Sequence, residues 1–166
     1  MDPKTLTSWF LQELKAEANA TRKCLERVPE SKFDWKPHDK SMTMGYLALI
    51  VAEIPLWITQ MVEKSEIDFV KFEHYKVIDT AGLVKHFDQN LAAAREALGN
   101  TNDEALLEQC HLKADGKIIY SSPKKDNVGI TLNHWVHHRG QLTVYLRLND
   151  IPVPSIYGPS ADDKSF

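Results

Sequence analysis

Apolar side chains recur every three or four positions along four separate stretches of this sequence, and this period constrains the fold more than any other feature. Residues with that spacing fall on one face of an α-helix, so each stretch predicts a helix with one buried face. The first stretch covers about six turns and ends at Pro29, which cannot continue a helix. The residues on its expected buried face, called its stripe, are Leu6, Phe10, Leu14, Ala18, Thr21, Leu25 and Val28, of which Thr21 is the one polar member.

The same pattern predicts three further helices. The second is expected to begin near Ser41 or Thr43, either of which can cap it, and it contains Pro55, which predicts a local kink. The third and fourth are expected at about 80–98 and 128–148. Their stripes are Leu47, Ile50, Val51, Ile54, Trp57, Ile58 and Met61 in the second helix, and Leu83, Val84, Phe87, Leu91, Ala94 and Leu98 in the third.

The connecting segments indicate how these helices are arranged. Residues 64–78 can reach roughly 50 Å when extended, whereas a 20-residue helix is only about 30 Å long. The third helix can therefore lie parallel to the second after a long crossover. Asp115 and Gly116, flanked by alternating apolar residues, predict a small hairpin before the fourth helix, and the proline-containing tail after Leu148 is expected to be extended over the bundle. The predicted fold class is all-α, a four-helix bundle.

Length and charge narrow the classes of function. We expect residues 1–166 to form one domain, because the chain is too short for two. A net charge of −3 and the lack of a basic stripe argue against nucleic acid as a partner. Cys24 and Cys110 are too few for a disulfide scaffold, and we interpret Cys24 as a packing residue. Without a leader pattern or an uninterrupted apolar run of about 18 residues, we expect a cytoplasmic protein that does not insert into a membrane.

The sequence "HWVHHRGQLTVYLR" places three of the seven histidines of the chain within five residues of the fourth helix. His134 and His138 are four residues apart and therefore share a face, whereas His137 points about 100° away from His138. Two imidazoles with this spacing can chelate one divalent ion, but a stable site needs a third protein ligand. The spacing alone also fits two histidines bonded to backbone or water, so both interpretations stay open.

The longer stretch "LNHWVHHRGQLTVYLRLNDIPVPSIYGPSADD" closely resembles the last helix and tail of the DinB-like family of DNA-damage-inducible proteins. A second match lies in "FDWKPHDKSMTMGYLALIVAEIPLW", and with the helical layout the resemblance covers essentially the whole chain. It implies a bundle with a long crossover, often dimeric, carrying a metal held by three histidines. Two of these correspond to His134 and His138. Some relatives are thiol-dependent transferases or isomerases, and many have no assigned activity.

The third family histidine is replaced in this chain. It belongs in a stretch that usually reads like "LA-x-H-I-A-E-I-P", and the matching position here is Ile50, which cannot coordinate a metal. We expect Ile50 to pack against the two histidines and to leave a drier, weaker site for zinc or nickel. Glu53, about 60° around the helix, can substitute as an oxygen ligand, although we favour a solvated or outer-sphere carboxylate.

Other polar residues carry less specific signals. Tyr145 fits a core aromatic better than an acid or substrate donor. Arg139 and Arg147 can hold an anionic substrate, but solvated surface arginines are the simpler interpretation. The remaining histidines look isolated and are interpreted as surface or loop residues; these are His38, His74, His86 and His111.

Two functions from different classes remain. One is a metal-dependent enzyme of the thiol-transferase or hydrolase type, in which His134 and His138 hold a metal that activates a bound thiol or water. The other is a bundle that has lost its catalytic metal and serves as a binding or stress-response module with a small-molecule ligand in its cleft. The missing third histidine favours the second. We also expect a homodimer, with Trp9 and Trp57 adding apolar surface.

Overall fold

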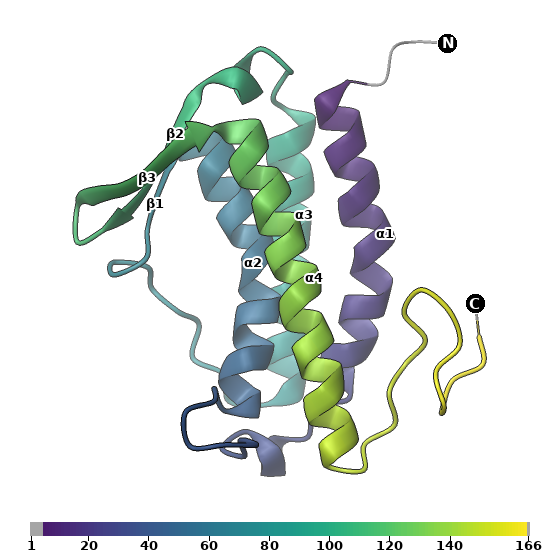
Figure 1. Ribbon diagram of the computed structural model, residues 1–166. Coiled ribbons are helices and arrows are strands. Elements are labelled where there is room, and N and C mark those ends of the chain that lie inside the picture. The colour runs from purple at the N-terminus through teal and green to yellow at the C-terminus, as the bar shows by residue number, and fades with distance from the viewer. Residues whose placement is uncertain (1–4, 166) are drawn as a thin grey trace.

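The structure, a computed structural model, describes residues 5–165 as a bundle of long helices with a small sheet at one end (Figure 1). The helices are α1 (Leu6–Glu26), α2 (Met44–Lys64), α3 (Thr80–Gly99) and α4 (Lys124–Leu148), and the strands are β1 (Glu66–Asp68), β2 (Gln109–Ala114) and β3 (Lys117–Pro123). The bundle and the β2–β3 hairpin agree with the expected fold. The expectation of an all-α chain needs one correction, because β1 pairs with β2 in parallel and makes the sheet mixed.

Local signals explain where three helices begin. Thr5, Thr43 and Asp79 each precede a helix, and each side chain accepts a hydrogen bond from the N–H three residues later. Thr43, rather than Ser41, is therefore the cap of α2. The fourth helix begins at Lys124, four residues before the expected start at about 128, directly after Pro123. Strand β1 has only three residues, which is too few to show the alternating pattern of a strand.

The crossover between α2 and α3 determines which helices are neighbours. α2 lies beside α3 and α4, and α1 packs against the same two helices from the other side. Residues 65–79 leave the sheet end of α2 and return along the bundle, so that α2 and α3 are parallel (Figure 1). At the far end, the Thr80 hydroxyl donates to the Val28 carbonyl at 2.6 Å, next to the end of α1. The long crossover has the form that the length of the segment predicts.

α2 is the central helix of the bundle. Its buried residues include Glu53 as well as the predicted apolar stripe. By length and composition alone α2 could cross a membrane, since an 18-residue window has a mean hydropathy of 1.5, but 83% of that window is buried inside the bundle. Its apolar surface is covered by α3, α4 and the crossover, as in the core helix of a globular domain. Trp57 is also covered, so it does not add the exposed apolar area expected for a dimer.

Pro55 lies inside α2 and leaves one carbonyl without its helical donor. A proline has no N–H, so the carbonyl four residues earlier, that of Val51, loses its normal partner. The indole N–H of Trp135 in α4 donates to this carbonyl at 2.9 Å. The next carbonyl, that of Ala52, accepts from the side-chain amide of Asn90 in α3 at 2.9 Å. α2 is thus bonded through its proline turn to both neighbouring helices.

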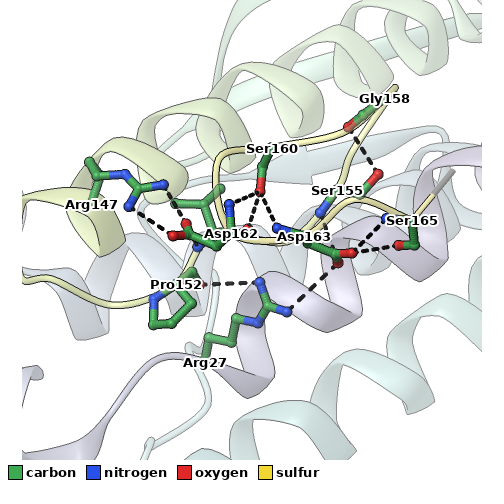
Figure 2. A network of polar contacts seen from close by, with 10 residues as sticks. Arg27, Arg147, Pro152, Ser155, Gly158, Ser160, Asp162, Asp163 and Ser165 are labelled. Carbon is green, nitrogen blue, oxygen red and sulfur yellow. Dashed lines mark hydrogen bonds and ion pairs between the residues drawn. The ribbon is translucent and has the colours of Figure 1, made fainter.

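The tail after α4 turns back on itself instead of remaining extended. Its backbone N–H at Ser160 donates to the carbonyl of Asp163 at 2.8 Å, which closes a turn. Figure 2 shows how two arginines hold this turn against the bundle. Arg147 of α4 forms an ion pair with Asp162, and Arg27, which follows α1, donates to the Pro152 carbonyl at 3.1 Å. The tail lies on the bundle surface as expected, in a compact form.

We expect Trp135→Phe to lower the free energy of unfolding by about 1–3 kcal/mol, because the buried Val51 carbonyl would lose its donor. In a Pro55→Ala background the new alanine N–H can donate to the same carbonyl, so Trp135→Phe should cost less there. Urea denaturation of the four proteins measures both costs. Equal costs in the two backgrounds would show that the indole does not compensate for the proline.

Candidate metal site on the fourth helix

Two imidazoles meet on one face of α4. His134 and His138 are one helical turn apart, and their Nε2 atoms lie 2.6 Å from each other. Both side chains are half-buried, whereas His137 is exposed and its ring lies edge-on to that of His138. The structure therefore brings together the pair that the spacing predicts and leaves the third histidine of the cluster outside it. That the pair binds a metal remains a prediction.

Gln141 orients one of the two rings. Its side-chain oxygen lies 2.7 Å from Nδ1 of His138, and an amide oxygen can only accept, so Nδ1 carries the proton. In a neutral ring the Nε2 of His138 then bears a lone pair and accepts from His134. A hydrogen bond that fixes the tautomer in this way is typical of metal-binding histidines. Gln141 was not among the residues predicted to form the site, although its position three residues after His138 places both side chains on one face of the helix.

Burial keeps both imidazoles neutral. Desolvation is the largest cause that lowers the pKa of His134, and the neighbouring His138 and His137 lower it further. Desolvation also lowers the pKa of His138, against an opposing contribution from the Gln141 hydrogen bond. Since a metal binds only the deprotonated nitrogen, protons compete less for this pair than for an exposed histidine.

The third family position is apolar in the structure as well as in the sequence. The bond from Trp135 to Val51 places the adjacent Ile50 at the level of the histidine turn, because α2 and α4 are antiparallel neighbours. Ile50 is 8% exposed. On the next turns of α2, the Trp57 ring packs against His134 with their centroids 5.6 Å apart. The ring contact between α2 and the imidazole pair is therefore made by the Trp57 indole, which offers no metal ligand.

The donor atoms fit a metal as a two-ligand site only. Two nitrogens bound to one tetrahedral zinc lie roughly 3.3 Å apart, so the His134–His138 pair must open by less than 1 Å from its hydrogen-bonded separation. Among residues 5–165, no three or more His, Cys, Asp and Glu side chains are grouped so that they could hold a metal.

Glu53 lies in a cluster with His74 and His86, away from the histidine pair of α4. This cluster corrects the interpretation of Glu53 as a solvated or outer-sphere carboxylate and that of His74 and His86 as isolated histidines. Its carboxylate accepts from the Tyr75 N–H at 2.8 Å and lies 2.6 Å from Nδ1 of His74, both in the crossover. Nε2 of His86 in α3 lies 3.6 Å from the same carboxylate. Glu53 is thus neither solvated nor a partner of the histidine pair, and His74 and His86 are not isolated. Burial lowers the pKa of His86, although the nearby Glu53 opposes that effect.

The two arginines that were considered for substrate binding have structural partners. Arg139 is 2% exposed and pairs with Glu17 of α1 at 2.5 Å, so its interpretation as a solvated residue is wrong. Arg147 holds Asp162 of the tail. Tyr145 packs against Trp35 and donates to the Met42 carbonyl at 3.2 Å, in agreement with a packing role.

The structure agrees with the interpretation of Cys24 as a packing residue and of His38 and His111 as surface or loop histidines. Cys24 is fully buried, and this burial raises the pKa of its thiol to about 11, as expected of a packing residue. His38 is exposed and accepts from the Lys40 N–H in a loop. His111 contacts the Ser121 hydroxyl across the hairpin at 2.8 Å. None of these three side chains lies among the residues that surround the histidine pair.

Comparison with known proteins points to one family. The family model described as the DinB family matches residues 1–165. The uncharacterized protein YrdA of Bacillus subtilis (strain 168) is 27% identical over 158 residues, which cover 93% of this chain and 89% of that protein. These matches extend over nearly the whole chain.

Solved structures share the fold. A DinB-like protein from Bacillus cereus ATCC 10987 superposes with a TM-score of 0.68 at 23% identity, covering 89% of this chain and 95% of that one. The DinB-like protein YjoA from Bacillus subtilis superposes with a TM-score of 0.69 at 16% identity, covering 94% and 99%. At these identities the structures support the arrangement of the helices and not a particular activity.

The lowered pKa values predict that acidification destabilises the fold. The folded state favours neutral His134 and His138, so their contribution is present above the unfolded histidine pKa of about 6.5 and is lost as the pH falls through the folded values. The double variant His134→Gln, His138→Gln should therefore lose less Tm than the wild type between pH 7 and pH 5. Scanning calorimetry measures this, with exposed His38→Gln as the control. An equal decrease in Tm from pH 7 to pH 5 for the double variant and the wild type would contradict the prediction.

Proposed function

This chain belongs to the DinB family, and from this premise we propose that it is a binding bundle that holds a divalent metal weakly through His134 and His138. The observation that carries the proposal is the convergence of the two Nε2 atoms, 2.6 Å apart. Among residues 5–165, no further His, Cys, Asp or Glu side chain is grouped with them as a third ligand. Zinc and nickel suit imidazole ligands. Water or a small molecule with a donor atom completes the coordination.

The state of the two rings supports binding. Gln141 presents the Nε2 lone pair of His138 toward the position between the rings, and burial keeps both imidazoles neutral near pH 7. The hydrogen bond between the rings must be given up when an ion binds, and His134 must move its proton from Nε2 to Nδ1. Both costs lower the affinity, in agreement with a site that exchanges its metal.

The loss of a ligand favours binding over catalysis. Ile50 supplies no donor, and Glu53 is occupied by His74 and the Tyr75 N–H. A second candidate function is a metal-dependent enzyme of the thiol-transferase or hydrolase type, favoured by the retention of both histidines of the last helix. A divalent ion, when bound, lowers the pKa of a coordinated thiol or water. The described side chains around the pair offer no carboxylate to accept the released proton, since Glu53 faces the crossover.

Restoring the third histidine tests the proposal. The Ile50→His variant should bind zinc at least about tenfold more tightly than the wild type, because three imidazoles replace two. Zinc at 100 times its Kd should then stabilise the variant by about 2.7 kcal/mol. Isothermal titration and thermal melts of protein prepared without an affinity tag measure both effects.

A matched control shows whether a gain in zinc affinity depends on where the new histidine is placed or only on the presence of one more histidine. Leu49 is as buried as Ile50 but points about 100° away around α2, so Leu49→His should not gain affinity. Adding His138→Ala to the Ile50→His protein should abolish the gain. If Ile50→His leaves the affinity unchanged, position 50 does not face the pair and the proposal fails.

We also propose that the chain is a homodimer that pairs through the outer face of α4. Val144 and Leu148 lie one turn apart there and are more than half exposed, at 56% and 57%. A two-fold axis would bury both residues of each copy at once. Sedimentation at tens of micromolar should show a dimer, and Val144→Lys should shift it toward monomer by placing two like charges near the axis. A wild-type monomer at that concentration would contradict the proposal.

A further inference from the structure

A narrow cleft of about 140 Å³ lies between α1 and α4. One wall consists of Trp9, Glu13 and Glu17, which occupy successive turns of α1. The other wall belongs to α4 and is formed by Gly129, Leu132, Asn133 and Val136. Leu132 and Val136 project away from His134 and His138, since residues two apart on a helix differ by about 200°. The cleft is therefore separate from the candidate metal site.

Gly129 contributes a stretch of the α4 wall that has no side chain. A Cβ atom at this position would have no neighbour within 4 Å, so a side chain would extend into free space. Glycine is also unfavourable inside a helix compared with alanine. The cleft thus exists where α4 carries a glycine opposite the Trp9–Glu13 turn of α1.

The charge in the cleft is negative. Among residues 5–165, no lysine, arginine or histidine lines it. Oε2 of Glu17 is occupied by Arg139 at 2.5 Å and by the Tyr157 hydroxyl at 2.9 Å, whereas its Oε1 makes no hydrogen bond with the described residues. Glu13 makes neither an ion pair nor a hydrogen bond with residues 5–165. After Arg139 has balanced Glu17, the charge of Glu13 remains uncompensated.

The remaining lining suits the apolar part of a cation. The Trp9 side chain is 48% exposed and presents its indole at the mouth of the cleft. Indole faces attract alkylammonium ions through the ring quadrupole. Leu132 and Val136 add aliphatic surface. An engineered cavity of about 150 Å³ accommodates benzene, so this cleft has room for a short alkyl chain and its charged head.

We propose that this cleft binds a small primary alkylammonium ion. The ammonium group donates hydrogen bonds to the carboxylate of Glu13 and to Oε1 of Glu17, and charge-assisted bonds of this kind are the strong ones. The alkyl chain lies against Trp9 and the aliphatic wall of α4. A primary ammonium fits better than a quaternary one because the carboxylates of Glu13 and Glu17 are acceptors, and only a primary ammonium has three N–H donors to offer them.

Titration with n-butylammonium chloride at constant ionic strength tests the proposal. Trp9 is the one tryptophan of the four in the chain that lines the cleft, so only its indole N–H signal should shift in ¹H–¹⁵N spectra. Trp9→Phe assigns that signal. We expect a saturable shift with a half-point at about millimolar concentration. No shift, or an equal shift with n-butanol, which has the same chain and no charge, would overturn the proposal.

Two variants separate the charge of the cleft from its shape. Glu13→Gln should weaken binding at least about fivefold, because it removes the uncompensated charge. Glu96→Gln makes the same change of net charge on the exposed face of α3 and should leave binding unchanged. Gly129→Leu should abolish the shift by filling the cleft without removing a contact. Unchanged binding in Glu13→Gln, or in a folded Gly129→Leu protein, would overturn the proposal.

Discussion

The hydrogen bond from the Trp135 indole to the Val51 carbonyl determines how α4 lies against α2. Pro55 creates the need for this bond, because it removes the helical donor of a carbonyl that is buried in the centre of the bundle. A shift of α4 along α2 by one turn, about 5.4 Å, would take the indole out of reach of that carbonyl. In the observed register His134 meets the ring of Trp57, and Ile50 is at the level of the histidine turn.

Besides the exposed face with Val144 and Leu148, α4 has three faces with separate positions in the structure. The Trp135 face joins the core, the His134–His138 face forms the candidate metal site, and the face with Gly129 and Val136 forms the wall of the anionic cleft. This division means that a substitution in the metal site need not disturb the cleft.

Local patterns were sufficient to predict the helices and the histidine pair, because both depend on spacing within one element. Contacts between distant segments were not predictable in this way. Glu53 meets His74 only because the crossover returns along α2, and Arg139 is buried only because Glu17 of α1, 122 residues away, reaches it. The presence of an arginine or a histidine in the sequence does not show whether a charged partner from a distant segment lies beside it in the fold. A three-residue strand such as β1 likewise has too few residues to show a period.

The number of imidazoles bound to the metal tests the central claim most directly. Zinc K-edge X-ray absorption of the zinc-loaded wild-type protein counts them, because imidazole rings give a characteristic scattering pattern beyond the first shell. We predict two imidazoles, from His134 and His138, with oxygen ligands completing the coordination at about 2.0–2.2 Å. A site with three or more imidazoles, or one with none, would contradict it.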